Sequence, residues 1–457
     1  MITHALHSIK VKLFGGIDTE TERLLDNSRW VFLANGVGTI GGILRVVLAT
    51  RILGAELFGS YTLAIAGVLI LQEFMRLNIA MGLIRFGARF LGEGAPEKIG
   101  ALFRYALLLT SISIAGSVTL IAAYVNIMPT ENIITHGIGT LIILFAFANG
   151  LSFIDALSRA GLKLFYRFRS ASILQITMDL TELAVISWTL YTYGPDLKAF
   201  FIAVISVRIV NSIVCNIGAW MEFRRELGTA LGGSIRLMKP HRAEFNKYIL
   251  GNSASSSLKV FMNQADVILL GSFFGTSTVG LYAATKKLGY SILSITDPFM
   301  QAVFPQFSRM LGEASSEKIK PMIKNLVRVA LPASLIILGL CTLLREPIVQ
   351  LVFGKTYAGA GWPFVISLAG ALQGAVFFWA LPLVQSLGLI KKRLLVTILG
   401  LISGAIAGYL LTPSLGAAGT ALALLIANVV ITAKFIQIGL QAISSEQKSH
   451  NTDKQPA

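Results

Sequence analysis

Long apolar stretches alternate with short polar connections along the whole chain. A helix that crosses the hydrocarbon core of a bilayer needs about 20 mostly apolar residues. The sequence therefore predicts twelve transmembrane helices, and these cover residues 29–50, 57–79, 101–126, 136–155, 170–192, 198–221, 248–272, 279–303, 325–345, 362–387, 393–413 and 416–440.

Basic residues alternate between the connections. If the N-terminus is cytoplasmic, 30 of the 39 Lys and Arg residues fall in cytoplasmic segments and only four fall in outer connections. Lys and Arg are retained on the cytoplasmic side of membrane proteins. One missed or added helix would invert the pattern downstream. The count of twelve and the cytoplasmic position of both termini therefore support each other.

Composition agrees with this pattern. The chain of 457 residues is 54% hydrophobic and 14% charged, whereas soluble domains carry about 25% charged residues. This excludes an ordinary soluble enzyme and a disordered chain. The net charge of +16 follows from the cytoplasmic connections, so it does not indicate a nucleic-acid partner.

An internal repeat divides the chain into two halves. Residues 45–64 and 266–285 share glycines and a tyrosine at an offset of 221, and RFLGEG from Arg89 matches RMLGEA from Arg309 at an offset of 220. The positions matched at 221 are Gly54 with Gly275, Gly59 with Gly280, and Tyr61 with Tyr282. Six helices per half keep the same sidedness, which predicts parallel repeats with a substrate path between them.

The predicted organisation has five regions. They are a cytoplasmic arm (1–28), an N-lobe of six helices (29–221), a basic cytoplasmic linker (222–247), a C-lobe of six helices (248–440) and a disordered cytoplasmic tail (441–457). The predicted fold class is an all-α integral membrane protein.

The first helix of each lobe carries a polar or small stripe. In 248–272, Lys259 and Asp266 lie on one helical face with Asn252, Ser256 and Asn263. Charged side chains in the hydrocarbon region face a cavity or a partner. A water-filled central cavity is the favoured interpretation, and helix packing through small and polar residues is the alternative.

The fifth and sixth helices carry buried charges of opposite sign. Asp179 and Glu182 lie on one face of 170–192, and Arg208 lies about 15 Å deep in 198–221, at a depth similar to that of Glu182. A structural pair between Glu182 and Arg208 is one interpretation. A protonation or ion-coupling site is the other.

Repeat-equivalent positions near the outer ends of the first helices carry opposite charges. Arg45 in the N-lobe corresponds to Asp266 in the C-lobe. We expect them to approach across the pseudo-two-fold axis and to close an outer gate. Lys286 and Lys287 follow on the eighth helix, and we expect one of them to face the cavity and the other to snorkel or pair.

Catalytic and energy-coupling motifs are missing from the sequence. The Gly354–Lys355–Thr356 triplet lacks the earlier glycine of a phosphate-binding loop, because Val349 stands at that position. Neither metal-ligand spacing nor a cofactor motif is found. The sequence predicts transport without ATP hydrolysis and no enzymatic activity.

Several segments resemble the polysaccharide flippases, the exporters of lipid-linked repeat units within the multidrug/oligosaccharidyl-lipid/polysaccharide superfamily. The resemblance spans about residues 29–440. Its segments are ILGAELFGSYTLA, GLIRFGARFLGEG, DVILLGSFFGTSTVGLYAATKKL, FPQFSRM, REPIVQLVFGKTYAGA and LGAAGTALALLIAN.

The resemblance implies a V-shaped bundle of two six-helix lobes around a central cavity. It also implies movement of a polyprenyl-diphosphate-linked oligosaccharide from the inner to the outer leaflet of a prokaryotic cell membrane. Cavity cations would meet the diphosphate, and the candidates are Arg45, Lys259, Lys286 and Arg208. Asp179, Glu182 and Asp266 are the candidates for ion coupling or gating.

The partners implied are the lipid-linked glycan, membrane lipids, H⁺ or Na⁺ as the coupling ion, and the polysaccharide polymerase machinery. The main alternative is an H⁺- or Na⁺-coupled multidrug exporter of the same superfamily. A peptidoglycan lipid flippase would have fourteen helices rather than twelve. A polymerase or ligase would have a large outer loop, whereas the outer connections here are short.

Overall fold

The computed structural model describes residues 19–127, 138–312 and 316–452, and every regular element in these ranges is helical. The first half contains α2 (Thr19–Met75), α3 (Ile79–Gly92), α4 (Pro96–Ile127), α6 (Gly139–Leu164), α7 (Phe168–Tyr193) and α8 (Leu197–Leu227), followed by the short 3₁₀ helices η1 (Gly228–Gly232) and η2 (Ile235–His241).

The second half begins with α9. Its elements are α9 (Arg242–Phe273), α10 (Thr276–Tyr290), α11 (Leu293–Gly312), η3 (Ser316–Lys318), α12 (Ile319–Leu343), α13 (Arg345–Phe353), η4 (Lys355–Tyr357), α14 (Gly361–Val376), α15 (Ala380–Ser386) and α16 (Ile390–Thr452). We keep the name N-lobe for α2 to α8 and the name C-lobe for α9 to α16.

Two glycines divide the longest helices into two membrane passes each. Gly54 in α2 has φ 75° and Gly416 in α16 has φ 55°, which are left-handed values that favour glycine. The pairs α10–α11 and α14–α15 each form one broken pass. Counted in this way, the elements correspond to the twelve predicted spans, and the predicted fold class is confirmed.

Hydropathy alone finds fewer spans in the described residues. Seven stretches are long and apolar enough to cross a membrane, or up to eight if the bent pair α14–α15 counts as one. Two of the seven, Arg29–Gly92 and Lys391–Ser444, each contain a double pass. In α9 the apolar stretch found among the described residues is Val260–Phe273, which is shorter than a membrane span.

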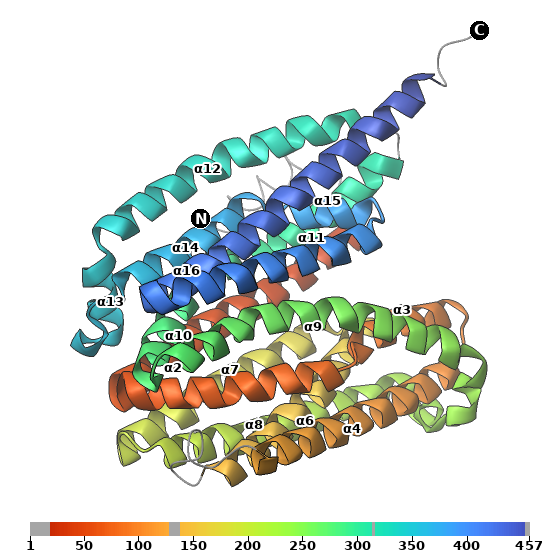
Figure 1. Cartoon of the computed structure of the whole chain (residues 1–457). Coiled ribbons are helices and arrows are strands. Elements are labelled where there is room, and N and C mark those ends of the chain that lie inside the picture. The colour runs from red at the N-terminus through yellow and green to blue at the C-terminus, as the bar shows by residue number, and fades with distance from the viewer. Residues whose placement is uncertain (1–18, 128–137, 313–315, 453–457) are drawn as a thin grey trace, which may run out of the picture.

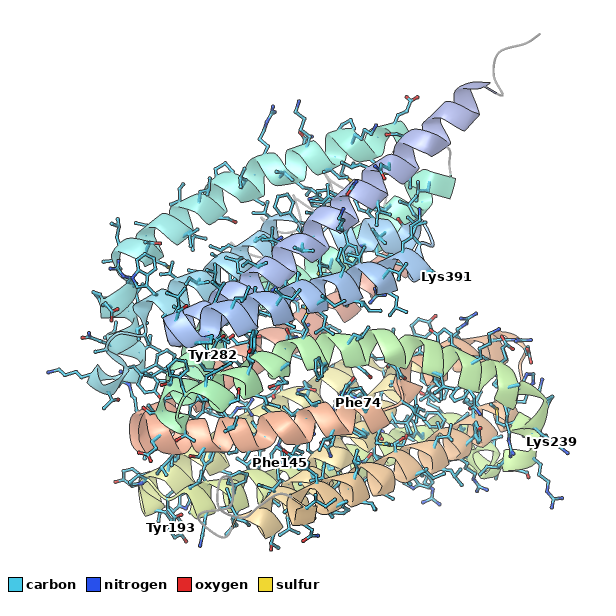
Figure 2. The ribbon with its side chains drawn as sticks, in the orientation of Figure 1. Phe74, Phe145, Tyr193, Lys239, Tyr282 and Lys391 are labelled. Carbon is cyan, nitrogen blue, oxygen red and sulfur yellow. The ribbon has the colours of Figure 1, made fainter. Side chains whose placement is uncertain are left out.

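The two lobes form a V (Figure 1). They meet near α2 and α10 and diverge toward the opposite end, and α9 runs along the N-lobe (Figure 1). Figure 2 places Lys239 and Lys391 at the diverging end, which we call the basic end, and Tyr193 at the other end, which we call the closed end.

The hydrophobic clusters explain this shape. The largest cluster joins both lobes, since it contains Phe58 and Tyr61 together with Phe353 and Leu368. Two further clusters lie toward the basic end, and each stays largely within one lobe. Packing between membrane helices depends on van der Waals contact at close approach. The lobes therefore share a core at the closed end and separate where their cores are independent.

A reciprocal glycine contact marks the symmetry axis. A Cβ atom on Gly59 would lie 1.8 Å from the carbonyl oxygen of Thr276, and one on Gly280 would lie 1.9 Å from the carbonyl oxygen of Ala55. Both residue pairs are related by the repeat offset of 221. The two contacts are therefore equivalent, and only glycine permits this approach of α2 to the start of α10.

A side chain adds to the junction beside these glycines. Arg51 of α2 donates through Nε to the carbonyl oxygen of Val352, at 2.9 Å, and through Nη2 to the carbonyl oxygen of Leu351. Both acceptors belong to α13 of the C-lobe. The closed end is thus held by apolar packing, by glycine contacts and by one arginine.

The connection between the lobes is mostly helical. The predicted linker 222–247 comprises the end of α8, then η1 and η2, and the start of α9. Leu231 and Met238 are buried in the N-lobe core, which ties the connection to that lobe. Residues 1–18 of the predicted arm and residues 453–457 of the predicted tail lie outside the described ranges, and α16 continues to Thr452.

Candidate functional site

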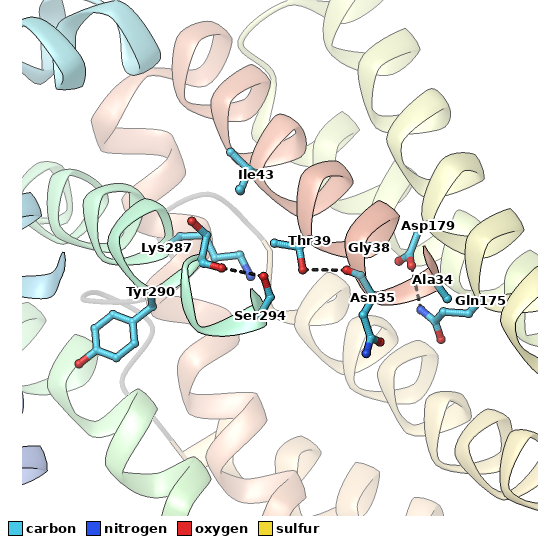
Figure 3. Close-up of a pocket in the computed structure, with 11 residues that line it drawn as sticks. Ala34, Asn35, Gly38, Thr39, Ile43, Gln175, Asp179, Lys287, Tyr290 and Ser294 are labelled. Carbon is cyan, nitrogen blue, oxygen red and sulfur yellow. Dashed lines mark hydrogen bonds between the residues drawn. The ribbon is translucent and has the colours of Figure 1, made fainter. Parts of the chain in front are cut away.

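A polar cavity of about 430 Å³ lies between the lobes (Figure 3). The N-lobe lines it with α2 and α7, and the C-lobe lines it with α10 and the start of α11. The lining residues are Ala34, Asn35, Gly38, Thr39, Ile43, Gln175, Asp179, Lys287, Tyr290, Ser291 and Ser294. We call this the central cavity.

The central cavity lies on the basic side of the interlobe junction. Ile43, its lining residue nearest the kink, is about 16 Å along α2 from Gly54, at 1.5 Å per residue. The shared apolar core and the glycine contacts lie beyond it, toward the closed end. A solute in this cavity is therefore separated from the closed end by the junction.

Lys287 is the cation of the central cavity. The structure records no ion pair and no hydrogen bond for its side chain within the described part of the chain. Its Nζ would lie 4.0 Å from a Cβ atom on Gly42, and Nη2 of Arg45 would lie 3.8 Å from the same point. One cation from each lobe therefore flanks Gly42.

Arg45 binds two carboxylates of α7. Its Nη1 donates to Oε2 of Glu182, and its Nη2 lies 4.0 Å from Oδ1 of Asp179. Gln175 donates to Oδ2 of Asp179 at 2.9 Å. Spacings of four and three residues put these α7 side chains on one face. Gly38 lets that face approach α2, because a Cβ atom there would lie 2.8 Å from Oδ2 of Asp179.

This triad of Arg45, Asp179 and Glu182 is only partly covered. The side chains are 18%, 13% and 20% exposed, and one guanidinium faces two carboxylates. A desolvated charge is costly unless it is paired. The triad therefore contains one more carboxylate than guanidinium groups.

A second polar cavity, of about 200 Å³, lies inside the N-lobe. Its lining is Ala148, Ser152, Asp155, Arg159, Gln175, Met178, Asp179, Glu182, Arg208 and Asn211. Gln175 and Asp179 line both this inner cavity and the central cavity. The α7 carboxyl groups therefore stand between the two spaces.

The expected pair of Glu182 with Arg208 is corrected by the structure. Glu182 is bound by Arg45, while Arg208 donates to Oδ1 of Asn149 and lies 5.0 Å from the ring centroid of Phe145. Both partners of Arg208 belong to α6. Arg45 reaches the carboxylate from α2, and Arg208 turns toward α6.

The expected approach of Arg45 to Asp266 is also wrong. Lys286 donates to Oδ2 of Asp266 at 2.5 Å and to the carbonyl oxygen of Asn263 at 2.7 Å. Tyr282 donates to the same carboxylate oxygen at 2.5 Å. Asp266 is thus neutralised within the C-lobe, so it is not a partner for Arg45.

The predicted cavity cations therefore have different surroundings. Arg45 lies beside the central cavity, Lys286 is tied to Asp266, and Arg208 lines the inner cavity. Lys259 belongs to α9, but its side chain lies outside what the structure describes. The sequence analysis expected one of Lys286 and Lys287 to face the cavity and the other to snorkel or pair, but it named Lys286 as the cavity cation, whereas Lys287 lines the central cavity and Lys286 pairs with Asp266. The i, i+4 spacing places Tyr282 and Lys286 on one face of α10. This spacing was the signal that Lys286 turns toward Asp266, as Tyr282 does.

No cluster of three or more His, Cys, Asp or Glu side chains suited to a metal ion occurs among the described residues.

A family model described as "Polysaccharide biosynthesis protein" matches residues 24–311, more than half of the chain. No curated protein matches the chain by sequence.

Solved structures of transporters share the fold. An inward-facing multidrug resistance MATE family transporter of the MOP superfamily has a TM-score of 0.65 at 16% identity, with 96% of this chain and 98% of that chain covered. The lipid II flippase MurJ, in an inward closed conformation, has a TM-score of 0.64 at 14% identity, with 95% and 94% covered. The Vibrio cholerae MATE transporter VcmN, as its D35N mutant, has a TM-score of 0.63 at 13% identity, with 94% and 98% covered.

Proposed function

Because the chain belongs to the family of polysaccharide biosynthesis proteins, we propose that it is a flippase that moves a polyprenyl-diphosphate-linked oligosaccharide across a prokaryotic cell membrane, from the inner to the outer leaflet. The observation that carries this proposal is Lys287, a cation without an acidic partner among the described residues, in a polar cavity between two lobes.

The charge distribution supports a cytoplasmic position for the basic end, because Lys and Arg are retained on that side. In this orientation the central cavity faces the cytoplasm and the junction at Gly59 and Gly280 closes the outer side. Rocking of one lobe against the other would then expose the cavity to the outer leaflet. Transport of this kind needs no covalent step.

The cavity chemistry suits a diphosphate that carries sugars. Lys287 supplies a point charge, and Arg45 supplies a planar donor that binds phosphate oxygens in pairs. Amide and hydroxyl groups of Asn35, Gln175 and Ser294 also line the cavity, and such groups exchange hydrogen bonds with sugar hydroxyls.

The triad supports coupling to an ion. A diphosphate that takes Arg45 leaves Asp179 and Glu182 without their cation, and an uncompensated carboxylate in the membrane is costly. H⁺ or Na⁺ at these carboxylates would restore the balance. Export would then be coupled to entry of the ion, with the carboxylates as the shared element.

A second candidate is an H⁺- or Na⁺-coupled multidrug exporter. The two carboxylates of the triad favour this candidate. They line the polar cavities, and carboxylates bind cationic drugs. Lys287 disfavours it, because a cation in the central cavity repels a cationic drug. The match to the polysaccharide family favours the glycan.

Deletion of the gene distinguishes the two candidates. For a flippase we expect lipid-linked glycan to accumulate on the cytoplasmic leaflet. The parent sequence and Lys355→Gln, a change of an exposed lysine away from the cavity, should both reverse this accumulation, whereas Lys287→Gln should not. Normal surface glycan together with raised dye sensitivity would overturn the proposal in favour of drug export.

A further inference from the structure

A third pocket lies on the flank of the N-lobe, away from both polar cavities. It has a volume of about 330 Å³ and lies between α4, α6 and α8. Its lining is Phe103, Arg104, Leu107, Ile154, Leu157, Ser158, Asn216, Trp220, Phe223 and Leu231. We call it the lateral pocket.

The lateral pocket has an apolar interior and an exposed apolar rim. Phe103, Leu157 and Phe223 are buried in its wall, whereas Leu107 and Trp220 are 44% and 53% exposed. In a membrane protein an exposed apolar rim faces lipid chains rather than water. The shape therefore suits a flexible hydrocarbon chain.

Arg104 is the only charged residue of this lining. Its side chain is exposed, and the structure records no acidic partner for it in the described ranges. We expect a guanidinium without an acidic partner at an apolar rim to bind an anionic group of the membrane.

The pocket lies close to the basic end of the helices that line it. Arg104 lies eight residues from the start of α4, or about 12 Å, and Trp220 lies seven residues before the end of α8, or about 10 Å. Both helix ends belong to the basic end. Trp and long basic side chains concentrate where hydrocarbon meets headgroups.

We propose that the lateral pocket binds one anionic phospholipid of the leaflet at the basic end. The lipid phosphate lies against the Arg104 guanidinium, and an acyl chain lies along Phe103, Leu157 and Phe223. Charge complementarity selects an anionic headgroup over a zwitterionic one. This lipid is distinct from the transported glycan lipid, because the pocket opens on the flank of the N-lobe rather than between the lobes.

The floor of the pocket connects this lipid to the inner cavity. Ser158 donates to Oδ1 of Asn216 at 2.6 Å, and Nδ2 of Asn216 donates to Oδ1 of Asp155 at 2.9 Å. Asp155 lines the inner cavity together with Asp179. The floor of the lateral pocket and the lining of the inner cavity are therefore joined by the hydrogen-bonded side chains of Asn216 and Asp155.

The test is thermal unfolding of the purified full chain in detergent, titrated with phosphatidylglycerol or phosphatidylcholine. Phosphatidylglycerol should raise the melting temperature more than phosphatidylcholine does. Arg104→Gln should weaken the apparent phosphatidylglycerol affinity about fivefold, the value of one basic residue at an anionic surface. The matched control Arg224→Gln changes an exposed arginine that does not line the pocket and should leave the affinity unchanged.

Two further arms make the result decisive. Leu107→Trp fills the rim without changing charge and should also abolish the preference for phosphatidylglycerol. Soluble glycerol phosphate at the same concentration should have no effect, since the chain contributes to binding. Equal stabilisation of Arg104→Gln, Arg224→Gln and the parent by phosphatidylglycerol would overturn the proposal. The readout is lipid binding, so it is independent of whether the chain transports a glycan.

Discussion

The two lobes use equivalent positions in opposite ways. Arg45 in the N-lobe and Asp266 in the C-lobe occupy the same place in the repeat. Arg45 serves two carboxylates, Asp179 and Glu182, at the border of the central and inner cavities. Asp266 is matched by the single cation Lys286 and is only 9% exposed. The N-lobe group carries one excess negative charge, and the C-lobe pair is balanced.

This difference predicts different tasks for the two lobes. A balanced buried pair has little to gain from a new partner, because separating it exposes two charges. The unbalanced triad gains when a cation binds and exchanges partners when an anion takes Arg45. The C-lobe instead contributes the unpaired Lys287 to the central cavity. Under the proposed function, the coupling ion would therefore bind in the N-lobe and the substrate would contact both lobes.

The largest effect is expected where the lobes are equivalent. Gly59→Val and Gly280→Val each place a side chain against a backbone carbonyl, so each should prevent closure at the junction. We expect transport at the level of the deletion strain for both variants, measured as surface glycan at matched protein abundance. Gly67→Ala is the control, because a Cβ atom there meets nothing within 4 Å. Loss of transport in one variant and normal transport in the other would contradict the equivalence of the two glycine contacts.

We expect substitutions of the adjacent lysines Lys286 and Lys287 to have very different effects on the free energy of unfolding. Lys286→Met leaves Asp266 buried without its cation, and loss of one partner of a buried pair costs roughly 3–5 kcal/mol. Lys287→Met removes no ion pair, so it should leave the free energy of unfolding unchanged within about 0.5 kcal/mol. Chemical denaturation in detergent measures both.

The double variant Asp266→Leu, Lys286→Met sharpens this result. It leaves no uncompensated charge, so it should recover much of the stability lost in Lys286→Met. A double variant less stable than Lys286→Met would show that the pair is not the source of the effect.

Ion dependence should distinguish the two acids. Asp179→Asn removes the excess charge of the triad, so transport should lose its dependence on the H⁺ or Na⁺ gradient. Asp266→Asn should lower protein stability and keep the gradient dependence. Uptake in proteoliposomes with and without each gradient gives the comparison. Loss of gradient dependence in Asp266→Asn but not in Asp179→Asn would reverse the roles of the lobes.

The smallest effect concerns the junction outside the glycines. Arg51→Gln loses the donors to two carbonyl groups of α13. These hydrogen bonds contribute about 1 kcal/mol net to the stability of the closed junction. Their loss should raise the ratio of open to closed junctions about fivefold. Labelling of Ser294→Cys by an impermeant thiol reagent from outside should therefore rise about fivefold. Cys215 and Cys341 are first replaced by Ala. An unchanged labelling rate would remove Arg51 from the junction.

The number and order of the membrane passes were predictable because their signals are repeated many times along the chain. Twelve apolar stretches, the basic connections and the glycine offset of 221 agree with one another, so a local ambiguity changes little. Hydropathy alone fails at α9, where the polar stripe lowers the mean, and at the double passes split by Gly54 and Gly416. The repeat and the charge alternation supplied what hydropathy lacked.

The pairing of the buried charges was not predictable from the same signals. Symmetry places Arg45 and Asp266 at equivalent depths, but it does not reveal that α7 brings two carboxylates to Arg45. Neighbouring helical residues differ by about 100° around the axis, so the choice between Lys286 and Lys287 depends on the rotation of α10. Such contacts depend on how separate helices pack, which one sequence does not specify.

The most direct test of the account is flipping of a short-chain polyprenyl-diphosphate oligosaccharide by the purified protein in proteoliposomes. The parent and Lys355→Gln should move the glycan lipid between leaflets at the same rate. Lys287→Gln should be roughly 10-fold slower or worse, because a hydrogen bond to a charged group contributes about 1.5–3 kcal/mol. Equal rates for Lys287→Gln and the parent, or no flipping of this lipid by the parent, would contradict the account.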